Sequence, residues 1–113
     1  MCMDISKKDL LRINYGFGGN LRSDSSLDFA VDKIKNSKLG FYIKLAYLWR
    51  AILVDHPFSD GNKRTAVFFA YAFAEESRKH IDRDLLVYQA VSIAKKNLTN
   101  IRQIGWRLKS CIK

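Results

Sequence analysis

An uncharged run in the middle of the chain reads Ala66-Val67-Phe68-Phe69-Ala70-Tyr71-Ala72-Phe73-Ala74. Alanine, which recurs through this run, has the highest helix propensity of all residues, so the run is expected to be helical. A helix that is apolar on every side is normally enclosed by other elements. The sequence therefore predicts a central helix here, surrounded by the rest of the fold.

The segments on both sides of this run also have apolar residues at helical spacing. Ser6 and Asp9 approximate a capping box, and Pro57 requires the helix before it to end, because the residue preceding proline disfavours the α region. No linker or internal repeat interrupts residues 1–113, so we predict a single domain, a compact all-α bundle. The other helices are expected from Ser6 to about Asn14, from Ser26 onward, over Phe41 to Asp55, over about Asp84 to Lys96 and from Thr99 onward, with a loop or small hairpin at Tyr15 to Ser25.

Composition narrows the class of protein. Of the 113 residues, 48% are hydrophobic and 27% are charged, which is ordinary for a folded soluble domain. No apolar stretch approaches the roughly 18 residues needed to cross a bilayer, and the first residues do not resemble a signal peptide. Cys2 and Cys111 have no metal-ligand spacing, so both are expected to be free thiols in a reducing cytoplasm, with a disulfide between them as the alternative.

The formal net charge of +9 is large for this size, but the lysines and arginines are spread over most segments. Solvated helix faces account for most of this charge, and an acidic protein partner is the alternative explanation. Direct binding of nucleic acid is not expected, because the cations form no continuous tract.

The segment with the most reactive side chains lies directly before the apolar run and reads His56-Pro57-Phe58-Ser59-Asp60-Gly61-Asn62-Lys63-Arg64-Thr65-Ala66. A helix N-terminus has unpaired N–H groups and a positive dipole end, so it favours phosphate. Lys63 and Arg64 fall in that first turn, where the dipole disfavours cations by roughly 0.3–1 kcal/mol each. A bound anion explains their presence, and two solvated cations are the plain alternative. We expect both side chains to bind phosphate, Arg64 in a bidentate manner.

The other polar positions suggest phosphoryl or nucleotidyl transfer. His56 is the candidate general base, since histidine titrates near neutral pH, and Asp60 is the candidate ligand of Mg²⁺. A structural histidine and a turn-forming or capping aspartate are the respective alternatives. Gly61 permits a tight turn, and Asn62 with the N–H groups after it is expected to form an anion hole. His80 has no such neighbours and is expected to be a surface residue.

These residues resemble the signature of the Fic/Doc family, His-x-Phe-x-(Asp/Glu)-Gly-Asn-(Gly/Lys)-Arg. Within the family the sequence is most similar to the death-on-curing (Doc) type. Lys63 stands where the Fic branch has glycine, and Val67 stands where that branch has a second arginine. The resemblance implies a helical fold over nearly the whole chain, with Phe58 anchoring the signature loop in the core.

The same resemblance assigns roles to the site residues. It implies that His56, Asp60 and Arg64 are catalytic, that Asp60 binds Mg²⁺, and that the residues from Gly61 to Arg64 bind the nucleotide. These roles agree with those expected from the residue types alone.

Fic proteins typically transfer AMP from ATP to a hydroxyl of a target protein, whereas Doc transfers the γ-phosphate to elongation factor Tu. The resemblance therefore implies a protein kinase that uses ATP and Mg²⁺, acts on a target protein such as a translation factor, and is the toxin of a toxin–antitoxin pair. The sequence carries no inhibitory motif (Ser/Thr)-x-x-x-Glu-(Gly/Asn) of the kind found in many Fic proteins, and the resemblance to Doc implies a separate antitoxin. AMP transfer is the first alternative, and a non-catalytic basic binding module is the second.

Overall fold

Six α-helices and no strand make up residues 5–113, the part of the chain that the computed structural model describes. The predicted all-α class is confirmed. Cys2 lies outside the described residues. None of the helices within them is long and apolar enough to cross a membrane. The helices are α1 (Lys7–Gly16), α2 (Ser25–Ile34), α3 (Phe41–Leu53), α4 (Asn62–Glu76), α5 (Arg83–Lys96) and α6 (Ile101–Cys111).

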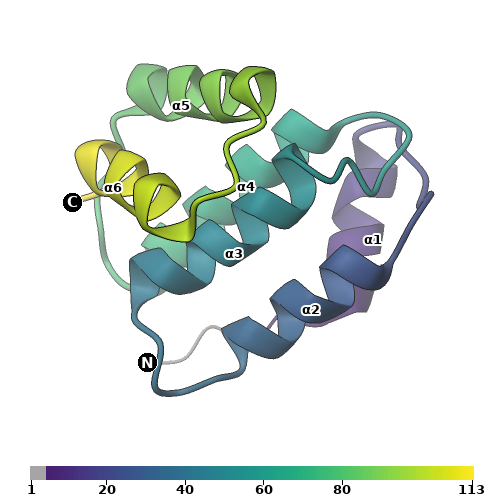
Figure 1. The fold of residues 1–113 in the computed structure, drawn as a ribbon, viewed down its shortest axis with the longest axis horizontal. Coiled ribbons are helices and arrows are strands. Elements are labelled where there is room, and N and C mark those ends of the chain that lie inside the picture. The colour runs from purple at the N-terminus through teal and green to yellow at the C-terminus, as the bar shows by residue number, and fades with distance from the viewer. Residues whose placement is uncertain (1–4) are drawn as a thin grey trace.

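Helix α3 lies at the centre of the bundle, where it contacts α2, α4, α5 and α6 (Figure 1). Its buried residues include Trp49, whose indole N–H donates a hydrogen bond to the Ala66 carbonyl of α4 at 2.9 Å. This bond joins α3 to α4 through a buried polar group that would otherwise be unsatisfied.

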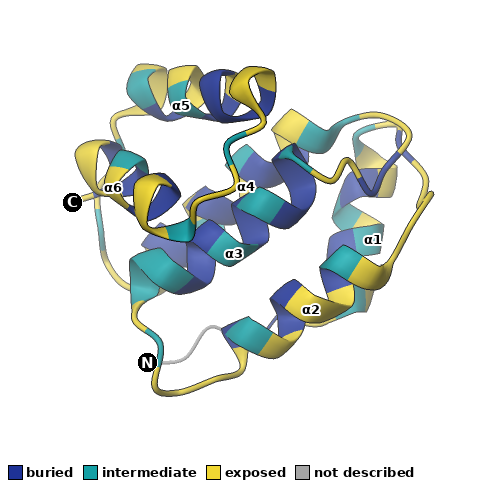
Figure 2. Ribbon diagram, in the orientation of Figure 1, coloured by how far each residue is buried: buried dark blue, intermediate teal, exposed yellow. Residues whose placement is uncertain are grey.

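Helix α4 was predicted to be surrounded on every side, and this prediction is wrong. Phe68 and Tyr71 are each 40% exposed, and Figure 2 shows that exposed and intermediate positions interrupt the buried surface of α4. The reason is that, among the helices of residues 5–113, α4 packs against α1, α3 and α5 only, which leaves part of its circumference without a neighbouring helix. Apolar residues all around a helix therefore do not guarantee neighbours all around it.

The predicted capping box at the start of α1 is confirmed. Ser6 Oγ accepts a hydrogen bond from Asp9 N at 3.2 Å, and the Asp9 carboxylate accepts one from Ser6 N at 3.0 Å. The hydrogen bond from Ser6 N, and a second one that Ser6 Oγ donates to the same carboxylate oxygen, lower the pKa of the Asp9 carboxyl, because both favour its charged form. Helix α3 ends at Leu53, four residues before Pro57 and two before the predicted end.

The start of α2 differs from the prediction. Ser26 was expected to cap this helix, but the N-cap is Asp24 and Ser26 already lies in the first turn. Asp24 makes no capping hydrogen bond because its carboxylate is paired with Lys7 Nζ at 2.8 Å. The loop before α2 is correspondingly shorter than predicted and spans residues 17–24, since Tyr15 and Gly16 continue α1.

The buried thiol of Cys111 is expected to resist alkylation in the folded protein. Burial raises its pKa to about 11, and the nearby Asp82 carboxylate adds to the shift. At pH 8 the reactive thiolate is therefore scarce as well as covered. Iodoacetamide should modify Cys111 of a Cys2→Ser variant only after denaturation, as measured by mass spectrometry. Rapid modification of the native variant would contradict this expectation.

Candidate active site

The signature loop is the segment between α3 and α4, residues 54–61, and it turns into α4 at Gly61. Gly61 is the N-cap and has a φ of 72°, in the left-handed region that favours glycine. A Cβ here would lie 3.1 Å from Phe17 Cβ and 3.2 Å from Asn14 Nδ2. The predicted glycine turn is confirmed, and it is packed closely enough that a side chain would force the loop away from α1.

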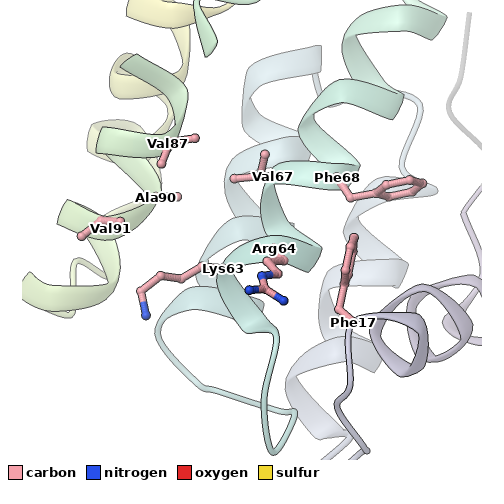
Figure 3. Close-up of a pocket in the computed structure, with 8 residues that line it drawn as sticks. All are labelled: Phe17, Lys63, Arg64, Val67, Phe68, Val87, Ala90 and Val91. Carbon is pink, nitrogen blue, oxygen red and sulfur yellow. The ribbon is translucent and has the colours of Figure 1, made fainter. Parts of the chain in front are cut away.

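The first turn of α4 concentrates positive charge. Within residues 5–113, no acceptor reaches the backbone N–H groups of Asn62, Lys63 or Arg64, whereas Thr65 N donates to Gly61 O at 2.9 Å. Lys63 and Arg64 are both exposed, the first turn has no acidic residue, and neither cation forms an ion pair with the described chain. Three unpaired N–H groups and two cations at one helix end suit an anion. Figure 3 shows Lys63 extending toward α5 while Arg64 lies nearer Phe17.

Asn62 holds the signature loop in shape. Its Nδ2 donates to Phe58 O at 3.0 Å, and its Oδ1 accepts from Phe58 N at 3.3 Å. Phe58 itself is only 1% exposed, which confirms its predicted role as the anchor of the loop. Because both amide atoms of Asn62 are engaged, its backbone N–H is the group that remains for an anion.

His56 lies on the loop just after α3, where its side chain is exposed. Its φ of 49° falls in the left-handed region, which costs an ordinary residue about 1–2 kcal/mol. The backbone around it is nevertheless fixed, since Pro57 is buried and its carbonyl accepts hydrogen bonds from Arg22 N at 2.7 Å and Ser23 N at 3.2 Å. The other histidine, His80, is exposed, as predicted for a surface residue.

Asp60 is exposed at the tip of the same loop, and its Oδ1 accepts a hydrogen bond from Gly61 N at 2.7 Å. It does not cap α4, since that helix has no side-chain cap. Its other carboxylate oxygen has no hydrogen bond to residues 5–113, and this part of the chain holds no cluster of three or more metal-ligating side chains. A cation at Asp60 would therefore take most of its ligands from phosphate and water, which is how Mg²⁺ usually binds. The residues present fit that ion.

Asn14, on α1, is a site residue that the sequence did not reveal. Its side chain is 1% exposed, and its Nδ2 donates to the Asp60 carbonyl at 2.8 Å and to Thr65 Oγ1 at 3.1 Å. These two bonds reach both sides of the Gly61 turn. Its Oδ1 is buried without a hydrogen-bond partner in the described chain. Asn14 thus joins α1 to the loop that carries the candidate catalytic residues.

The glycine-rich loop between α1 and α2 runs beside the signature loop. Ser59 N donates to Asn20 O at 2.8 Å, Asn20 N donates to Ser59 Oγ at 3.0 Å, and Leu21 forms a β-bridge with Phe58. A Cβ on Gly19 would lie 2.3 Å from the Asp60 carbonyl oxygen, so this close approach requires glycine. The glycines of this loop were the only sequence signal for the contact, and they did not indicate its partner.

An apolar pocket of about 370 Å³ lies beside Lys63 and Arg64, between α4 and α5. Figure 3 shows Val67 pointing into the space between the two helices, toward Val87 of α5. Val67 stands one turn after Lys63, so the pocket wall beyond the first turn of α4 is hydrocarbon and carries no second cation there. The pocket is lined by Phe17, Lys63, Arg64, Val67, Phe68, Val87, Ala90 and Val91.

The structure thus brings together a glycine turn, an exposed histidine and a helix end with unpaired N–H groups and two cations. The family model described as the Fic/DOC family matches residues 7–74, which is more than half of the chain and includes the whole signature loop. The chain belongs to the Fic/DOC family, which is generally a family of transferases. Comparisons with curated proteins and with solved structures gave no match.

Proposed function

We propose that this protein is a Doc-type protein phosphotransferase, which moves the γ-phosphate of ATP to a hydroxyl of a target protein. The hydroxyl oxygen forms a bond to the γ-phosphorus while the bond from that phosphorus to the β–γ bridging oxygen breaks, and ADP leaves. His56 accepts the hydroxyl proton, and Arg64 with the N–H groups of the first turn of α4 stabilises the phosphate charge. Mg²⁺ held by Asp60 would neutralise further phosphate charge.

The observation that carries this proposal is the pair Lys63 and Val67. Both residues line the pocket between α4 and α5, where Lys63 extends from the first turn of α4 toward α5 and Val67 contributes an apolar wall one turn further on. Phosphates extending past Lys63 would be desolvated against hydrocarbon without a cation to pair with, which is unfavourable. A nucleotide whose γ-phosphate sits at the helix end avoids that cost, and this pose favours phosphate transfer over AMP transfer.

Lys63→Gly is expected to lower γ-phosphate transfer about 10–100-fold, because a hydrogen bond to a charged phosphate contributes roughly 1.5–3 kcal/mol. The measurement uses ATP labelled at the α- or the γ-phosphate, with a cell lysate as the source of target. The wild-type protein should pass only the γ label to protein. Lys8→Gly is a matched control, because Lys8 is likewise at the second position of its helix. Transfer of the α label by the wild type would favour an AMP transferase instead. Transfer of neither label would favour a non-catalytic binding module.

Asp60→Ala and Asp60→Asn are both expected to abolish Mg²⁺-dependent transfer and to make ATP binding insensitive to Mg²⁺. The asparagine retains an oxygen for the Gly61 N–H, so it removes the charge while preserving the turn. Calorimetric titration with ATP, with and without Mg²⁺, measures the effect. If Asp60→Asn keeps full dependence on Mg²⁺, the ion is held by other groups.

The proposal extends to an antitoxin protein. An amphipathic helix could place its apolar face in the pocket between α4 and α5, which Val67, Phe68 and Val91 help to line. Such a helix would also cover Lys63 and Arg64, and so would compete with ATP. Acidic residues on it would complement the net charge of +9.

A further inference from the structure

A second hollow, of about 450 Å³, lies between the start of α3 and α6, and none of its residues belongs to the candidate active site. Trp106 lies at this hollow with 67% of its surface exposed, the largest exposure of any tryptophan or phenylalanine in residues 5–113. Exposed tryptophan beside a cavity is typical of protein interaction sites. The hollow is lined by Gly40, Phe41, Tyr42, Ile43, Arg102, Gly105, Trp106 and Lys109.

The presence of glycine at position 105 indicates that a group from outside the chain occupies the hollow. It lies in the interior of α6, where glycine destabilises a helix relative to alanine. Neither backbone nor packing requires it, because its φ is not positive and a Cβ would lie at an ordinary 3.8 Å from Ile43 Cδ1. The missing side chain leaves the floor of the hollow open. The fold itself gains nothing from this opening, whereas a group inserted from outside would use it.

The surroundings of the hollow are cationic. Arg102 and Lys109 are exposed, and they lie on the same face of α6 as Gly105 and Trp106, since a helix turns twice in about seven residues. Lys79 Nζ and Lys109 Nζ lie 5.3 and 5.5 Å from the centre of the Tyr42 ring. No acidic residue lines the hollow, and the ion pairs within residues 5–113 involve none of these cations.

We propose that this surface of α3 and α6 docks an acidic segment of a partner protein, with one apolar side chain of that segment inserted over Gly105 beside Trp106. The spacing fits an extended chain. Arg102 and Lys109 are seven residues apart, which is about 10 Å along a helix. An extended peptide covers that distance in about three residues, so carboxylates on either side of an apolar anchor can each reach a cation.

Single-stranded nucleic acid also binds to surfaces that combine cations with an aromatic ring, but the arrangement of the rings in this hollow favours a peptide. The rings of Phe41 and Tyr42 are each approached by a lysine of the chain itself, Lys79 at 5.3 Å from both centroids. A base stacking on either ring would compete with that lysine, so Trp106 is the most accessible aromatic platform of the hollow. A hollow over a glycine suits one inserted side chain better than a row of stacked bases.

The test measures binding of a fluorescein-labelled peptide, with one central phenylalanine flanked by glutamates, by fluorescence anisotropy. Trp106→Ala should weaken binding about tenfold or more, and Arg102→Glu about threefold to fivefold. Lys8→Glu makes the same charge change as Arg102→Glu on α1, which does not contact α6, and should have little effect. Gly105→Ala should raise the melting temperature and still weaken binding about threefold or more, because its methyl group takes space from the anchor. A destabilised or misfolded variant cannot produce that combination.

Three results would overturn the proposal. The first is no binding of the peptide below about 1 mM, or equal binding of a peptide whose phenylalanine is replaced by alanine. The second is tighter, Trp106-dependent binding of an oligothymidylate of equal charge, which would identify a nucleic-acid surface. The third is a dimer in solution that Trp106→Ala converts to a monomer, which would identify an interface between copies of this chain.

Discussion

His56→Ala should lower phosphate transfer to protein by about 10²–10⁴-fold while the fold and the affinity for ATP remain nearly unchanged. This is the usual contribution of a general base. His56 is the exposed imidazole on the loop that leads into the first turn of α4, where Lys63 and Arg64 lie. Its side chain makes no hydrogen bond to residues 5–113, so its removal breaks no structural contact there. The measurement is the rate of γ-label transfer from ATP, with the melting temperature as a check of folding.

Because His56 has a left-handed φ, the test needs further variants whose residues tolerate that backbone conformation. Alanine in this conformation is strained, whereas glycine and asparagine tolerate it. His56→Gly and His56→Asn should therefore lose transfer as fully as His56→Ala without the strain. Imidazole added to His56→Gly should restore part of the rate, because the free base can take the vacated place. His80→Ala removes the other exposed histidine and should leave the rate of transfer unchanged. Near-normal transfer by His56→Asn would remove His56 from the mechanism.

The sequence predicted the helices well where local signals decide them. The capping box of Ser6 and Asp9, the end of α3 before Pro57 and the turn at Gly61 all depend on residues close together in the chain. The start of α2 was misplaced because a long-range contact decides it. Asp24 is held by Lys7, 17 residues away, and no local pattern indicates that pair.

The same distinction separates what could and could not be predicted about the candidate site. The cations of the first turn of α4 and the buried anchor Phe58 were predicted from one continuous segment. The contacts of Asn14 were not, because they join residues 46 and 51 positions apart. The exposed face of α4 was missed for a related reason, since Phe68 and Tyr71 do not reveal whether another helix reaches them.

Asn14→Ala is expected to destabilise the fold by about 2–4 kcal/mol and to lower transfer by about 10²-fold. The variant loses the hydrogen bonds that Asn14 donates to the Asp60 carbonyl and to Thr65 Oγ1. The first acceptor is then left without this donor in a partly buried position, and the second in a buried one. The loop that carries Asp60 would then no longer be held against α1, and a displacement of about 1 Å can cost about 10²-fold in rate. Urea unfolding measures the first effect, and γ-label transfer at saturating ATP measures the second.

Two further variants distinguish a positioning role for Asn14 from a general loss of packing. Asn14→Asp keeps the shape but replaces the donor with an oxygen that faces the Asp60 carbonyl, so it should damage transfer at least as much as Asn14→Ala. Asn20→Ala, on the neighbouring loop, removes an exposed amide whose side chain makes no hydrogen bond to the described residues, and it should change neither quantity. A destabilised Asn14→Ala that still transfers phosphate at the wild-type rate, measured well below its melting temperature, would show that Asn14 supports the bundle and not the site. Loss of transfer at a temperature where the variant is fully folded is the result expected if α1 holds the signature loop in its active shape.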